Sequence, residues 1–139
     1  MATYRSIPLK FWQDRKVSDD FTPDDRYIFL YLLTNPHTNL CGCYEISEQQ
    51  ISRETGLDIE RVTLTIDRLW QQHQVIMFDV DKSEVLITNW HKYNWSSSKV
   101  AIGVKKQAED IKNASFKKYV LDTLSVRYPY SMDTTDTDI

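Results

Sequence analysis

Residues 47–72, SEQQISRETGLDIERVTLTIDRLWQQ, decide the fold, because they predict two short helices joined by a tight turn. Ser47 is a preferred N-cap, and Gln50, three residues later, is its predicted capping-box partner. Gly56 supplies the left-handed residue that ends the first helix, and Asp58 caps the second. This pattern is typical of a helix-turn-helix.

The second helix has two different faces when its residues are placed at about 100° per residue. One face is apolar and is predicted to build a core: Ile59, Val62, Ile66, Leu69 and Trp70. The opposite face is predicted to contact DNA: Arg61, Leu64, Thr65, Arg68 and Gln72. Its guanidinium, hydroxyl and amide groups can hydrogen-bond phosphates and base edges in a major groove. A solvated helix surface gives the same pattern, and Glu60 and Asp67 beside the arginines weaken the electrostatic argument.

Patterns before and after this helix pair predict a small sheet. Residues 75–80 (VIMFDV) and 85–90 (VLITNW) are β-branched and aromatic runs separated by residues 81–84, which predicts a hairpin. Residues 44–46 predict a third strand. The order helix, strand, two helices, hairpin favours a mainly α (α+β) fold: a winged helix-turn-helix with a small β-hairpin wing and additional C-terminal helices.

A strong start signal precedes the first helix of this fold. Residues 22–25 (TPDD) supply an N-cap, a proline at the first position and two acids in the first turn. Residues 27–33 continue it and are too apolar for a single buried face. They predict either burial on several sides or contact with a second subunit.

The chain divides into four predicted parts: an N-terminal arm (1–21), a winged-helix domain (22–95), a C-terminal helical extension (96–128) and a disordered acidic tail or linker (129–139). The extension is predicted to hold helices over residues 99–113 and 116–126. The tail is assigned by its polar, repetitive composition.

Five further cations are predicted to contact the DNA backbone: Arg5, Lys10, Lys92, Lys105 and Lys106. The N-terminal arm also carries Phe11 and Trp12, so it either docks through its rings or reaches for phosphates. Lys105 and Lys106 lie in residues 99–118, a stretch that contains six lysines and two acids. A solvated surface and a phosphate-contacting surface both fit that stretch.

Residues 89–95, NWHKYNW, place four rings around Lys92. They predict either packing that locks the hairpin onto the first helix or a stacking platform for unpaired bases, with Lys92 beside it for phosphate. We interpret Trp90 and Trp95 as structural.

Composition bounds the function. The 139 residues suffice for one packed domain, and a net charge of −3 argues against nucleic-acid binding by bulk charge alone. Asp133, Asp136 and Asp138 account for that excess. No signal-peptide core or membrane-length apolar run is present, which predicts a cytoplasmic protein without a membrane partner.

No catalytic constellation stands out, so the chain is predicted not to be an enzyme and to need no cofactor. His37, Cys41 and Cys43 offer three ligand types for zinc, but their spacing is poor for tetrahedral coordination. Reduced thiols and no metal are therefore predicted.

Three segments resemble the N-terminal domain of phage and prophage replisome organisers of the DnaD-like type: residues 4–17 (YRSIPLKFWQDRKV), 21–47 (FTPDDRYIFLYLLTNPHTNLCGCYEIS) and 85–95 (VLITNWHKYNW). The resemblance covers about residues 1–130. It implies a winged-helix domain in the cytoplasm of a bacterial host that helps to initiate phage DNA replication. Homo-oligomerisation and contact with double- or single-stranded DNA are part of that implication. Members commonly carry a second helical domain that binds DNA and touches the helicase-loading machinery, and this sequence ends in the predicted linker.

We therefore predict a DNA-binding replication-initiation domain that contacts DNA through its recognition helix and self-assembles. Two alternatives stay open. One is an oligomerisation scaffold with little DNA affinity. The other is a small phage regulator that inhibits a partner protein, with the acidic tail as a DNA mimic.

Overall fold

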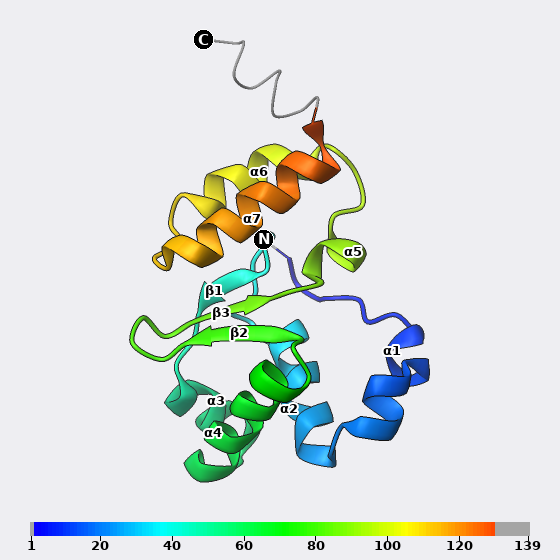
Figure 1. The fold of residues 1–139 in the computed structure, drawn as a ribbon, viewed down its shortest axis with the longest axis vertical. Helices are drawn as coiled ribbons and strands as arrows, with labels where there is room; N and C mark the ends of the chain where they lie inside the picture. Colours follow the sequence, from blue (N-terminus) through cyan, green and yellow to red (C-terminus); the bar gives the residue numbers. More distant parts are fainter. Residues whose placement is uncertain (1, 130–139) are drawn as a thin grey trace.

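The structure is a computed structural model that describes residues 2–129. As predicted, this part of the chain is mainly helical, with a three-stranded antiparallel sheet. Figure 1 shows α2, α3 and α4 on one side of the sheet and the pair α6 and α7 on the other. The arrangement is that of a winged helix-turn-helix with additional C-terminal helices.

Three helices form the base of the winged helix: α2 (Pro23–Thr34), α3 (Glu48–Thr55) and α4 (Ile59–Asp67). One π-helical turn, η2 (Arg68–Gln72), continues α4. Helix α2 begins with a complete capping box, in which Thr22 Oγ1 accepts from the Asp25 N–H and the Asp25 carboxylate accepts from the Thr22 N–H. The predicted start of α2 is confirmed.

The caps of the helix pair follow the sequence with one exception. Ser47 Oγ accepts from the Gln50 N–H at 3.1 Å, and Asp58 Oδ1 accepts from the backbone N–H three residues on at 3.0 Å. Gly56 has a φ of 80° and ends α3. The predicted reciprocal capping bond is wrong, because the Gln50 side chain instead bonds the Glu54 carboxylate on the outer surface of α3.

The sheet has the order β1-β3-β2, with β1 (Cys43–Glu45), β2 (Ile76–Asp79) and β3 (Glu84–Ile87). Val85 lies opposite Tyr44 on one side and Phe78 on the other, so β3 is the central strand. The predicted hairpin is confirmed, and β1 is shifted by one residue from its prediction.

Trp90 is a correction, because it begins helix α5 (Trp90–Asn94) and does not end a strand. Its indole N–H and that of Trp95 both donate to the Leu40 carbonyl at 2.9 Å, and both rings are buried. The two tryptophans are structural, as interpreted. They hold the loop before β1, which explains why the chain leaves the sheet at this point.

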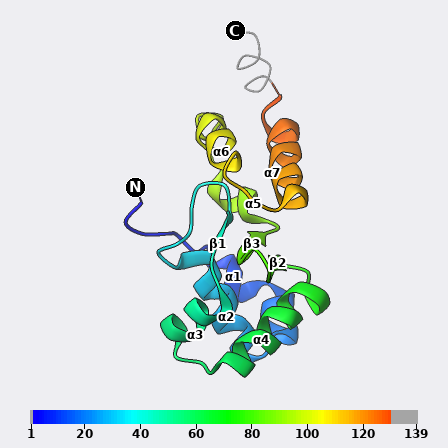
Figure 2. The ribbon, with the colours of Figure 1, turned by 90° about the vertical axis from the view of Figure 1, so that its left-hand side faces the viewer.

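The C-terminal extension consists of α6 (Val100–Ala108) and α7 (Ala114–Arg127), which pack on each other above the sheet (Figure 2). Helix α6 ends earlier than predicted. The chain turns after it because both carboxylate oxygens of buried Glu84, at the start of β3, accept backbone N–H groups. Lys112 and Asn113 donate these bonds, each at 2.9 Å.

The N-terminal arm contains a short helix, α1 (Lys10–Gln13), and a π-helical turn, η1 (Lys16–Asp20), neither of which was predicted. Phe11 is buried and stacks on Phe29 of α2 with ring centroids 6.1 Å apart. Trp12 is 57% exposed. The arm therefore docks through one ring of its aromatic pair.

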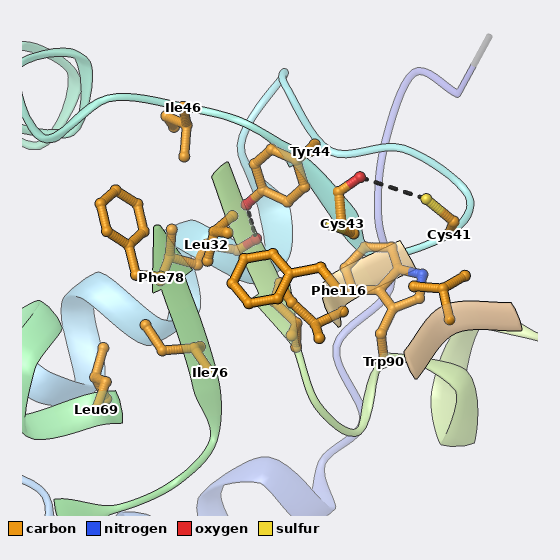
Figure 3. Packing of buried hydrophobic residues seen from close by; sticks show 14 of the residues in the cluster. Leu32, Cys41, Cys43, Tyr44, Ile46, Leu69, Ile76, Phe78, Trp90 and Phe116 are labelled. Carbon is orange, nitrogen blue, oxygen red and sulfur yellow. Dashed lines mark hydrogen bonds between the residues drawn. The ribbon is translucent and has the colours of Figure 1, made fainter. Parts of the chain in front are cut away.

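A continuous core runs from the winged helix through the sheet to the extension. Figure 3 shows buried side chains of this core from three elements, among them Leu69 of η2, Phe78 of β2 and Phe116 of α7. The Tyr44 hydroxyl donates to the Leu32 carbonyl of α2 at 2.5 Å, which ties β1 to that helix. Ile28 and Leu32 bury one side of α2 fully, and Phe29, Leu30 and Leu33 are only partly buried against the core, so both predicted alternatives for this helix stay open.

Candidate nucleic-acid interface

The solvent-exposed face of helix α4 differs from the face that was predicted to contact DNA. The core side is buried as expected: Val62, Ile66 and Leu69. At about 100° per residue, the side opposite them carries these exposed residues: Glu60, Leu64, Asp67 and Gln71. Two carboxylates on this side would repel DNA phosphates. Ile59, predicted to be core, lies at the edge of the buried side and is 42% exposed.

Of the five DNA-contacting residues predicted on the second helix, Arg61, Thr65 and Arg68 lie on the flank that faces α2. Arg61 makes a two-point ion pair with Asp24 at the start of α2, with Nε to Oδ2 at 3.0 Å and Nη2 to Oδ1 at 2.7 Å. The hydrogen bond from Arg61 lowers the pKa of Asp24. The Arg61 side chain is 52% exposed, so it can exchange this carboxylate for a phosphate.

Arg68 and Thr65 belong to a buried polar network. The carboxylate of Asp25 is fully buried and accepts from Arg68 Nε at 2.8 Å, with His73 Nε2 at 3.1 Å. Arg68 Nη2 in turn donates to Thr65 Oγ1 at 3.0 Å. The prediction that Thr65 faces outward is wrong, because this flank packs against the start of α2 and leaves Thr65 with no exposed surface.

Burial by itself raises the pKa of Asp25, but its hydrogen bonds outweigh that effect and hold the pKa below the ordinary value. The donors are the Thr22 N–H, Arg68 and His73. Asp25 is therefore charged at neutral pH, and Arg68 is held as its partner. Leu64 and Gln72 are exposed as predicted, and DNA contact by them stays a prediction.

The N-terminal arm and α5 enclose a cavity of about 320 Å³, which we call the arm–α5 cavity. Its floor is apolar and buried: Phe11, Val17, Phe21, Ile87 and Trp90. Its rim is exposed and mostly cationic: Lys10, Asp14, Lys16, Lys92 and Tyr93. Two predicted contacts, Lys10 and Lys92, thus meet at one opening although 82 positions separate them in the chain.

The lysines of this rim differ in their bonding. Within residues 2–129, the side chains of Lys10 and Lys92 make no hydrogen bond or ion pair. Lys16 Nζ donates to the His73 carbonyl at 2.8 Å, and the Asp14 carboxylate accepts from the Lys16 backbone N–H at 2.8 Å. A phosphate could therefore be bound by Lys10 and Lys92 without breaking an existing ion pair.

The other three residues that were predicted to contact the DNA backbone do not lie on this rim. Arg5 donates to Thr38 Oγ1 at 2.9 Å and lies 5.4 Å from the centroid of the Trp90 ring, so it fastens the arm to the α2–β1 loop. Lys105 and Lys106 lie in the last turn of α6, and Lys106 is exposed. DNA contact by these three residues stays a prediction.

Cys41 and Cys43 are both free and buried, and burial raises the pKa of each thiol. Among residues 2–129, no group of three or more His, Cys, Asp or Glu side chains is placed to hold a metal ion. In the same part of the chain, no helix combines the length and apolarity needed to cross a membrane.

Sequence reasoning missed Lys16 and Tyr93 as rim residues and Asp24 and Asp25 as partners of the arginines. The charge count of the arm and the aromatic run 89–95 contained a signal for the first pair. Asp24 and Asp25 are fully explained as residues that start a helix, so no signal in the nearby sequence indicated that they pair with arginines 37 and 43 positions away.

The fold and this surface define a winged helix-turn-helix protein with a cationic rim beside α5. No protein-family model, curated protein or solved structure matches the chain.

Proposed function

We propose that the protein is a DNA-binding domain that takes part in the initiation of phage or prophage replication. Its winged-helix fold and the sequence resemblance support the class. The observation that carries DNA contact is the arm–α5 rim, where Lys10 and Lys92 have no ion-pair partner within residues 2–129. Phosphate contacts from unpaired lysines give affinity through counterion release.

On this proposal the recognition helix contributes less to DNA binding than its sequence predicts. Arg61 is exposed and can reach a phosphate by leaving Asp24. Arg68 stays on Asp25, and the exposed side of α4 carries Glu60 and Asp67. DNA binding is therefore centred on the rim, with Arg61 as a secondary contact.

The test is binding of the chain to labelled duplex and single-stranded DNA across a salt series. A Lys10→Ala/Lys92→Ala variant should weaken binding and reduce the salt slope by about one for each phosphate that the protein no longer neutralises. An Arg53→Ala/Lys82→Ala variant removes the same charge from α3 and the β2–β3 turn and is the matched control. Equal losses of DNA affinity in both variants would contradict the assignment of the rim as the DNA site. No binding by the wild-type chain at low salt would contradict the proposed function.

Arg61→Ala separates the rim from the recognition helix. If Arg61 touches a base, its loss should weaken binding roughly five- to hundredfold. A phosphate contact would give a smaller and sequence-independent loss. Melting temperature should hardly change, because the Arg61–Asp24 pair is on the surface.

Self-assembly is a second candidate function, favoured by exposed apolar residues on the N-terminal arm. Tyr4 is 80% exposed, Leu9 is 83% exposed and Trp12 is 57% exposed. Sedimentation should then show an oligomer, and Leu9→Ser/Trp12→Ser should shift it towards monomer. A monomeric wild-type chain at all accessible concentrations would rule this function out.

A further inference from the structure

We propose that the arm–α5 cavity holds one unpaired base of single-stranded DNA, with Tyr93 stacking on it and the rim lysines on its flanking phosphates. This inference rests on the proposed DNA-binding function and names the form of DNA that the site selects.

The size and floor of the cavity fit a single base. Its volume of about 320 Å³ lies at the lower end of the roughly 300–1,000 Å³ typical of ligand pockets. Its floor is built from aromatic and aliphatic side chains that are already packed and buried, such as Phe11 and Trp90. A flat, partly apolar ring can be buried there without leaving a charge unpaired.

Polar groups at the opening fit the edge and backbone of a nucleotide. Tyr93 lies on the rim and is 55% exposed, so its ring is accessible to a base. Asn89 lines the cavity, and its side-chain amide makes no hydrogen bond within residues 2–129, so it can pair with a base edge. Lys92 precedes Tyr93 in α5, and Lys10 reaches the same opening from α1.

Charge complementarity favours a nucleic acid over an apolar peptide as the occupant. Three lysines surround the opening against Asp14, whose carboxylate already accepts from the Lys16 N–H. An apolar side chain would fill the floor but would leave these lysines without a counter-charge. A base in a duplex cannot enter without unstacking and unpairing, which costs a few kcal/mol. The cavity therefore distinguishes single strands from duplexes.

The experiment compares Tyr93→Ala with Tyr93→Phe in the full chain. The probes are a labelled oligothymidylate of about 12 nucleotides, within the usual range of single-strand sites, and a duplex of equal length. Tyr93→Ala should lose roughly five- to hundredfold in single-strand affinity, and Tyr93→Phe should retain it because the stacking ring remains. Duplex affinity should be unchanged in both, and melting curves should confirm that both variants fold.

A second measurement locates the base directly. An oligonucleotide carrying 5-iododeoxyuridine should cross-link to the peptide that contains Tyr93 or to the arm peptide with Phe11. Cross-links confined to α4, or full affinity for an oligonucleotide with abasic positions, would overturn the inference. Unchanged single-strand affinity in Tyr93→Ala would overturn it as well and leave DNA binding by the protein intact, whereas a wild-type chain that binds neither probe would remove both proposals.

Discussion

The carboxylate of Asp25 joins three parts of the winged helix. It closes the capping box of α2, holds Arg68 of η2 and contacts the His73 ring directly after η2. Because Asp25 is fully buried, its charge is stabilised by these donors and not by water. Asp25 therefore links the start of α2 to the end of α4.

Asp25→Asn should lower the free energy of unfolding by about 2–4 kcal/mol at pH 7, since it leaves buried donors without their charged acceptor. The pKa of Asp25 lies below the ordinary value of 3.8 in the folded state. Its stabilisation is therefore present above about pH 4 and is lost as the pH falls through the folded pKa. Urea denaturation of the wild type and of Asp25→Asn between pH 7 and pH 3 should show that the difference in their free energies of unfolding becomes smaller as the pH falls.

The neighbouring Asp24→Asn is the matched control for this prediction. Asp24 also lies in the first turn of α2 and also pairs with an arginine, Arg61 of α4, but at the surface. Surface pairs contribute little, so this variant should unfold almost like the wild type. Equal losses in the two variants would show that the helix start, and not the buried network, is responsible.

At the scale of elements, Glu84 connects the sheet to the C-terminal extension. Its two oxygens accept the Lys112 and Asn113 backbone N–H groups, and Asn113 then caps α7. Glu84→Gln should cost about 1–3 kcal/mol, because a glutamine has one acceptor oxygen and leaves one of these part-buried hydrogen bonds unmade. Hydrogen exchange should accelerate in α6 and α7 more than in α3.

Glu45→Gln is the control for the connection between sheet and extension. Glu45 lies opposite Glu84 in the β1–β3 register and pairs with the Lys112 side chain, but it is exposed. The substitution should leave exchange in α6 and α7 unchanged. If it loosens the extension as much as Glu84→Gln, the surface ion pair is the connection.

The elements that sequence predicted well are those with local signals. Ser47, Gly56 and Asp58 act within a few residues, so both helices of the turn could be placed from sequence. The exposed face of α4 could not be predicted, because it depends on acids of α2 that are more than 30 positions away. The arm–α5 cavity was hidden for the same reason, since its two halves meet only through the folded core.

For the whole molecule, the distribution of charge matters more than its sum. The chain carries −3 in total, yet the arm–α5 rim places three lysines beside one aspartate. Asp133, Asp136 and Asp138 hold the entire negative excess. They lie outside the described residues, as does nearly all of the predicted tail, so the sequence alone locates this charge.

Removing residues 133–139 brings the net charge of the chain from −3 to zero. DNA binding at low salt should strengthen, because the repulsion between these aspartates and the phosphates is lost. The gain should fade as salt rises, since screening shortens the reach of exposed charges to roughly 8 Å at physiological ionic strength. A full-length variant with all three aspartates changed to asparagine should reproduce the gain. If the deletion strengthens binding and this variant does not, the tail acts by occupying the DNA site and not by its charge.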